Sequence, residues 1–137
     1  MNRLTAFCLL AACSFATFAA SPSEEAADRL LAVSLKQEVA ANDPRVTQTR
    51  LWLDKAAKLA GEEPTAIAYA CSRYAGHLHD AAQVEATPLE LLEALTRFGK
   101  AGKPMRDTLQ EYATARKAVP GRSHADTLVA LTAPVRK

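Results

Sequence analysis

Four side chains that could bind a partner recur at helical spacing after Pro64. They are Tyr69, Arg73, His77 and Asp80, and Gly76 lies among them. Residues three or four apart on a helix share a face, so these side chains can meet. A glycine in mid-helix is unfavourable by about 0.5–1 kcal/mol relative to alanine, and close approach of another helix or of a partner is one reason to keep it. We predict that this face contacts a partner protein or a ligand. The alternatives are an ordinary solvated face, or a face covered by the first or the sixth helix.

A second group of candidate binding residues is basic. Lys100, Lys103 and Arg106 surround the start of a predicted helix at Pro104, where free N–H groups and the helix dipole favour anions. The stretch from Gly99 to Lys103 lacks the upstream glycine, the following Ser or Thr and the preceding strand of a phosphate-binding P-loop. We predict that these three residues bind a phosphate, a carboxylate or an acidic protein patch. A polar turn between helices is the alternative.

The residue types that hold metals or catalyse reactions do not converge. His77 and His79 are two residues apart and would point about 200° apart on a helix, so they cannot share one ion. Cys71 falls on the apolar face of the same helix, away from His77. Ser123, His124 and Asp126 fit a helix start better than a catalytic triad. We therefore expect no metal, no cofactor and no enzymatic activity.

The elements that position these residues are helices. Six segments carry apolar residues at helical intervals, and capping residues or prolines mark their starts. They span residues 21–42, 43–60, 64–85, 87–98, 104–119 and 123–133. No segment alternates with period two over a useful length. The sequence predicts an all-α fold, a single small domain of about six short amphipathic helices packed as a bundle or as stacked α-hairpins.

The N-terminus has the features of an export signal. Arg3 precedes an uncharged run from Leu4 to Phe18 that ends in small residues, so residues 1–19 are predicted to be a signal peptide cleaved after Ala19. Residues 20–137 then form the helical domain. An uncleaved anchor would need about 20 apolar residues. Lipidation at Cys13 is the other alternative, but the apolar run before this residue is short and the chain after it stays apolar.

Cysteine usage and charge limit how this domain holds together and what it binds. Removal of the leader leaves one thiol, Cys71, so packing and not disulfides must hold the fold. Residues 20–96 carry 7 Lys and Arg against 12 Asp and Glu, whereas residues 97–137 carry 9 against 3. The near-neutral total argues against nucleic-acid binding. The basic C-terminal third could meet an acidic partner or an anionic membrane surface, or be an ordinary solvated face.

These features together favour a binding protein over an enzyme. We expect a small periplasmic protein of a bacterial envelope, without a transmembrane segment in its mature form, that acts as a non-enzymatic protein-binding module. An inhibitor, an immunity-type protein or an accessory subunit would fit. Its partner would be another envelope protein, for which an acidic surface is one option. The alternative is a periplasmic carrier or sensor of a small apolar or anionic ligand.

Overall fold

The protein is all-helical, as its sequence predicts. A computed structural model describes residues 20–40 and 42–133, and the predicted signal peptide with Cys13 lies outside these ranges. Within them the chain forms six α-helices, one 3-10 turn and no strand. The elements are α1 (Pro22–Leu35), α2 (Pro44–Ala60), α3 (Pro64–Ala82), α4 (Pro88–Phe98), α5 (Met105–Ala118), the 3-10 turn η1 (Pro120–Arg122) and α6 (His124–Thr132). None of the helices in these ranges has both the length and the apolar character needed to cross a bilayer.

The predicted helix starts are confirmed by their caps. The side chains of Ser21, Asp43, Thr87 and Ser123 each accept a hydrogen bond from a backbone N–H in the first turn of α1, α2, α4 and α6. At Thr87 the capping box is complete, because the Thr87 N–H also donates to Glu90 Oε2 over 2.9 Å. These contacts satisfy N–H groups that have no partner inside the helix. Local sequence is therefore enough to place these four starts.

Two helices end earlier than their apolar patterns predict. The first was expected to reach Asn42 but stops at Leu35, and the third was expected to reach Glu85 but stops at Ala82. The residues that follow, Lys36 and Gln83, adopt left-handed backbone angles with φ of 55° and 51°. Neither is a glycine or asparagine, the usual residues there, so the sequence carries no stop signal.

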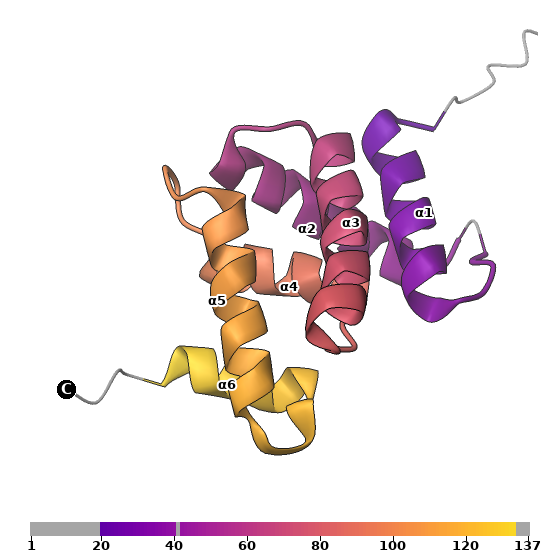
Figure 1. Ribbon diagram of the computed structural model, residues 1–137. Coiled ribbons are helices and arrows are strands. Elements are labelled where there is room, and N and C mark those ends of the chain that lie inside the picture. The colour runs from indigo at the N-terminus through magenta and orange to yellow at the C-terminus, as the bar shows by residue number, and fades with distance from the viewer. Residues whose placement is uncertain (1–19, 41, 134–137) are drawn as a thin grey trace, which may run out of the picture.

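The helices form a bundle in which α3 lies between two neighbours. Figure 1 shows α3 at the front of the molecule, with α1 on one side, α5 on the other and α2 and α4 behind. Helix α3 packs against α1, α2 and α4, and α5 packs against α4 and α6. The largest fully buried side chains come from all of α1 to α5 and include Leu30, Leu31, Leu53, Ile67, Leu91, Leu92, Leu109 and Tyr112.

One detail of the apolar pattern differs from the prediction. On α3 the buried face includes Ala68 and Ala75, so it is rotated away from Ala81, which is exposed. On α6 the buried residues are Thr127 and Leu128, and the apolar Val129 is 69% exposed. Helix α6 is short and buries only the side that meets α5 and α4. Cys71 is fully buried, as expected.

Candidate functional site

The predicted partner-binding residues lie together on the outer face of α3. Tyr69, Arg73, His77 and Asp80 are all exposed, and Tyr69 is 65% exposed although it is a large aromatic residue. A side chain added at Gly76 would meet nothing within 4 Å. Neither the first nor the sixth helix covers this face. No helix of the described chain therefore explains the mid-helix glycine.

Three of the four residues share a hollow of about 310 Å³ on this face. Tyr69, Arg73 and His77 line it together with Tyr74, whereas Asp80 does not. The guanidinium carbon of Arg73 lies 5.8 Å from the centroid of the Tyr69 ring, within the range of a cation–π contact. The Tyr74 and His77 rings lie 6.0 Å apart between centroids. The hollow is thus aromatic with one permanent positive charge at its edge.

Tyr74 connects this hollow to α5 and was not identified from the sequence. Its hydroxyl donates a hydrogen bond to Gln110 Oε1 over 2.9 Å. Burial raises the pKa of Tyr74, and the positive charge of Arg106 opposes that rise. Arg106 belongs to the predicted anion-binding group, so the structure brings one member of that group beside the α3 face. Because Tyr74 fits the apolar stripe, only the position of α5 reveals its second role.

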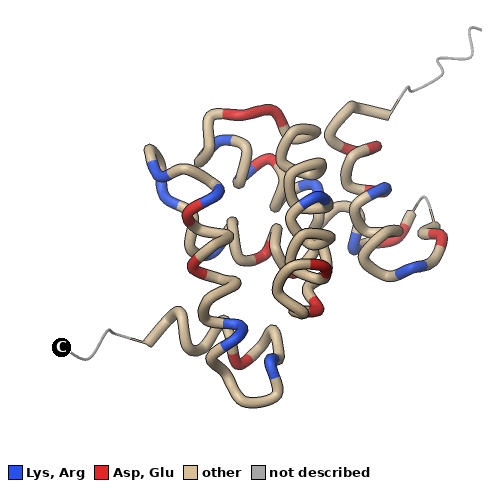
Figure 2. The backbone as a smooth tube through the Cα atoms, in the orientation of Figure 1, with Lys and Arg blue, Asp and Glu red and all other residues tan. Residues whose placement is uncertain are grey.

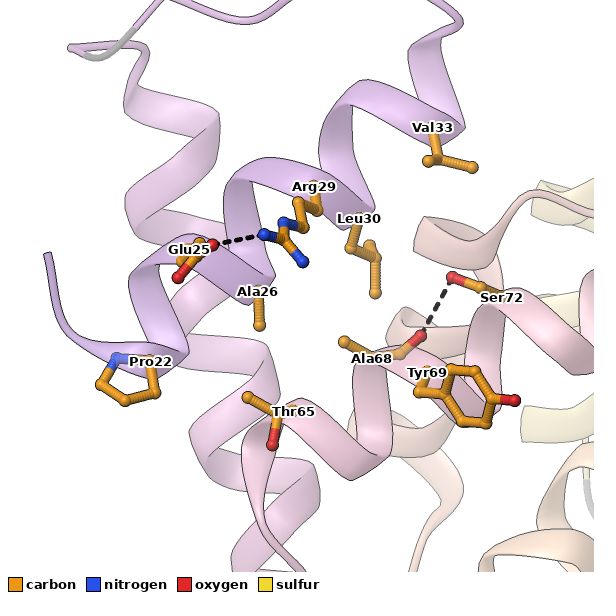
Figure 3. Close-up of a pocket in the computed structure, with 10 residues that line it drawn as sticks. All are labelled: Pro22, Glu25, Ala26, Arg29, Leu30, Val33, Thr65, Ala68, Tyr69 and Ser72. Atoms are coloured by element: carbon orange, nitrogen blue, oxygen red, sulfur yellow. Dashed lines mark hydrogen bonds and ion pairs between the residues drawn. The ribbon is translucent and has the colours of Figure 1, made fainter.

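A second hollow lies between α1 and α3, as Figure 3 shows. It measures about 300 Å³, and its apolar lining comes from Pro22, Ala26, Leu30, Val33, Ala68 and Tyr69. The ion pair between Arg29 and Glu25 stands at its edge, and the Ser72 hydroxyl donates to the Ala68 carbonyl over 3.0 Å. Tyr69 borders both hollows. Val33 is an apolar residue that lies off the buried stripe of α1. This position was the one feature of the sequence that could have indicated the groove.

The three predicted anion-binding residues do not converge on one point. Lys103 forms an ion pair with Glu111 at 2.6 Å. Lys100 and Lys103 border a hollow of about 10 Å³, which Arg106 does not line. A space of this size holds about one water molecule. The first turn of α5 also contains Asp107, and Figure 2 shows basic and acidic segments side by side there.

A buried polar network joins α4, α5 and α6. Arg116 donates to the Tyr112 hydroxyl and, over 2.9 Å, to the Glu85 carbonyl. His124 bonds to the Tyr112 hydroxyl through Nδ1 at 2.9 Å and to Glu93 Oε2 through Nε2 at 3.0 Å. Since Arg116 can only donate, the directions agree when Tyr112 donates to Nδ1 and Nε2–H donates to Glu93. The network holds α6 against the bundle, and its buried hydroxyl faces no hollow of the described chain.

Structural roles account for the contacts of His79, for the burial of Cys71 and for the Ser123–Asp126 pair. Ser123 bonds to Asp126 as a helix cap, while His124 points elsewhere, so the three do not form a triad. His79 contacts Glu85 over 2.8 Å. Burial raises the pKa of the Cys71 thiol to about 12. The residues that the structure describes contain no group of three or more His, Cys, Asp or Glu side chains placed to hold a metal ion.

The outer face of α3 and its two hollows therefore form the candidate functional site. No family model, curated protein or solved structure matches this chain.

Proposed function

We propose that this protein is a non-enzymatic, protein-binding module of the bacterial envelope and that it docks its partner on the outer face of α3. The observation that carries the proposal is the placement of Tyr69, which is 65% exposed between two hollows. Tyrosine is enriched at protein interfaces, which favours an interface over a purely solvated helix face. An inhibitor, an immunity-type protein or an accessory subunit would use such a face.

The chemistry of this face supports a protein partner. Tyrosine and arginine are enriched among the residues that dominate binding energy at interfaces, and here Arg73 lies over the Tyr69 ring. Gly76 leaves the helix backbone open at the centre of the face, which allows a partner helix to approach closely. The exposed Val33 extends the apolar surface across the α1–α3 hollow.

Site-specific photo-crosslinking in native envelopes tests this proposal. A benzoylphenylalanine in place of Tyr69 should form an adduct with one protein. The matched control is the same substitution at Leu51 on α2, which is 54% exposed and lines neither hollow. We expect a discrete adduct from position 69 alone. Equal adducts from both positions, or none from position 69, would contradict docking on α3.

A second variant separates loss of docking from loss of folding. Gly76→Gln adds a long side chain at a position where a Cβ meets nothing within 4 Å, and it replaces glycine with a better helix former. The helix should be as stable as before, or more stable, while the adduct at position 69 disappears. A Gly76→Gln protein that keeps the full adduct would show that no partner approaches the backbone there.

The α1–α3 hollow favours a second candidate function, the carriage of a small apolar ligand. Its volume of about 300 Å³ lies at the lower end of the range for small-molecule sites. Native mass spectrometry of protein purified under mild conditions distinguishes the two functions. A retained small mass that is lost on Ala68→Trp would favour the carrier, and a co-purifying protein would favour the docking module.

A further inference from the structure

Each of the two helices that Tyr74 connects carries an exposed arginine, Arg73 on α3 and Arg106 on α5. Arg73 lines the hollow from α3. Tyr74 extends to α5, where its hydroxyl reaches Gln110, and Arg106 lies one helical turn before Gln110 on the same face of α5. The charge of Arg106 acts on the Tyr74 phenol. Tyr74 thus links the face of α3 that carries Arg73 to the face of α5 that carries Arg106.

These two arginines differ from most of the others that the structure describes. Arg29, Arg45, Arg97 and Arg116 each have a carboxylate within 4.0 Å. In the described part of the chain, Arg73 and Arg106 have neither an ion pair nor a hydrogen-bond acceptor. Arg73 is instead held against the Tyr69 ring, which orders its side chain before any ligand arrives.

A guanidinium group presents its N–H donors in a planar fork that matches the two oxygens of a carboxylate. A carboxylate that docks on this face would find one such donor group on α3 and another on α5. We propose that the partner segment that docks on α3 is acidic, and that one of its carboxylates binds between Arg73 and Arg106 above Tyr74. This inference rests on the proposed docking function and adds the chemistry of the partner.

The surroundings favour a single carboxylate of a protein over an extended anionic surface. Asp80 follows on α3, and Asp107 is adjacent to Arg106 on α5. Figure 2 shows this alternation, with a basic segment in mid-α3 and acidic ones near its C-terminal end. Recognition of an anionic membrane needs clusters of about four to eight basic residues, and the carboxylates here interrupt such a cluster.

The test uses the mature chain, labelled for nuclear magnetic resonance, and two synthetic amphipathic helical peptides as probes. The peptides share their apolar positions and differ only in having Glu or Lys at the polar ones. We expect the Glu peptide to shift the side-chain signals of Arg73 and Arg106 and the ring signals of Tyr74, and the Lys peptide to leave them unchanged. Vesicles containing anionic phospholipid form a third arm.

Charge-removing variants then locate the contact. Arg73→Gln and Arg106→Gln should each weaken Glu-peptide binding about two- to fivefold, the range expected for one carboxylate contact near the surface. The matched control is Lys55→Gln with Lys58→Gln on α2, where both lysines are exposed. This control removes two charges and should leave binding unchanged. An equal loss in the control would show a general charge effect and overturn the proposed site.

The remaining outcomes separate this inference from the docking function on which it rests. Equal binding of the two peptides, no binding of either, or binding of the vesicles alone through the same arginines would overturn the acidic-partner inference. The crosslink at position 69 could survive any of these results, and the docking function would then stand without a charge requirement. If position 69 forms no adduct in native envelopes, the docking function fails and the inference fails with it.

Discussion

The thiol of Cys71 should be chemically silent in the folded protein. The side chain is fully buried, and burial raises its pKa to about 12, whereas the thiolate is the form that reacts. We expect no labelling by a maleimide or a disulfide reagent at mildly alkaline pH, followed by complete labelling after addition of denaturant. Rapid labelling of the native protein would show that the face of α3 that packs on the core opens.

The phenol of Tyr112 should titrate at a higher pH than an ordinary tyrosine. Burial, the largest cause, raises its pKa to about 12, while the charge of Arg116 opposes the rise. Because the folded pKa lies above the unfolded value of about 10, Tyr112 contributes stability that is fully present below pH 10 and is lost as pH rises through about 12. Tyrosinate absorbance during alkaline titration measures this pKa, and the Tyr112→Phe variant should lack the step near pH 12. An unchanged step near pH 12 in that variant would contradict the assignment.

The residues of the α3 face show how far sequence alone can place a candidate site. Helical spacing was sufficient to group Tyr69, Arg73 and His77, because a helix fixes which of its own residues share a face. The approach of Arg106 to Tyr74 depends on how α5 packs beside α3, and local spacing carries no signal for that. The pairing of Lys103 with Glu111 was missed for a related reason, since it joins the loop before α5 to the second turn of that helix.

At the scale of single helices, two glycines should respond in opposite ways to the same substitution. A Cβ at Gly99 would lie 2.4 Å from the Leu95 carbonyl oxygen, whereas a Cβ at Gly76 meets nothing within 4 Å. Gly99→Ala should therefore destabilise the protein by about 1–3 kcal/mol, the usual cost of overpacking. Gly76→Ala should stabilise it by about 0.5–1 kcal/mol through helix propensity. Urea unfolding of the two variants measures both, and equal shifts of the same sign would refute this reading of the α4 terminus.

The docking of α6 should depend on the buried Tyr112 hydroxyl. Tyr112→Phe leaves His124 Nδ1 and an Arg116 N–H without their shared partner, and an unsatisfied buried polar group costs about 1–3 kcal/mol. Tyr74→Phe is the matched control, because it removes an exposed hydrogen bond to Gln110 and should change stability by less than about 0.5 kcal/mol. Both values come from urea unfolding. Equal losses would show that the network does not fasten α6.

The helix starts were more predictable than the helix ends. A start at Thr87 is encoded in four adjacent residues, because the Thr87 and Glu90 side chains bond to each other's backbone N–H groups. The ends at Leu35 and Ala82 depend on Lys36 and Gln83 taking left-handed angles. At Val84, the chain after α3 turns back to donate to the Leu78 carbonyl, and the Val84 side chain is fully buried. Such a turn is favoured by the core that receives Val84 and not by the residues of the turn.

Over the whole molecule, folding neutralises much of the charge asymmetry seen along the sequence. Arg97, Lys103 and Arg116 in the basic C-terminal third lie within 4.0 Å of Glu93, Glu111 and Glu90 respectively. Two of these carboxylates, Glu90 and Glu93, come from the acidic part of the chain. Net charge by region therefore overstated the basic surface in the described part of the chain. Net charge by region could not show that Tyr74 would link Arg73, from the acidic part of the chain, to the helix that carries Arg106, from the basic part.

Export should remove residues 1–19 and leave the helical domain as the mature protein. Cleavage after Ala19 would leave Ser21, the residue that caps α1, at the second position of a mature chain of 118 residues. We expect intact-mass analysis of periplasmic protein to show a chain that begins at Ala20. Circular dichroism of that form should show mainly helix, and a reducing agent should not change its unfolding midpoint because Cys71 is its single thiol.

Two leader variants make the test specific. Ala19→Arg places a large charged side chain where signal peptidase requires a small one, so the precursor should accumulate at full length. Cys13→Ser should be processed normally, because Cys13 lies inside the segment that is predicted to be removed. A mass increase of the wild-type protein by lipid, lost on Cys13→Ser, would instead make Cys13 the first residue of a membrane-anchored form. The α3 face would then act at the membrane surface, and its acidic partner would be expected there.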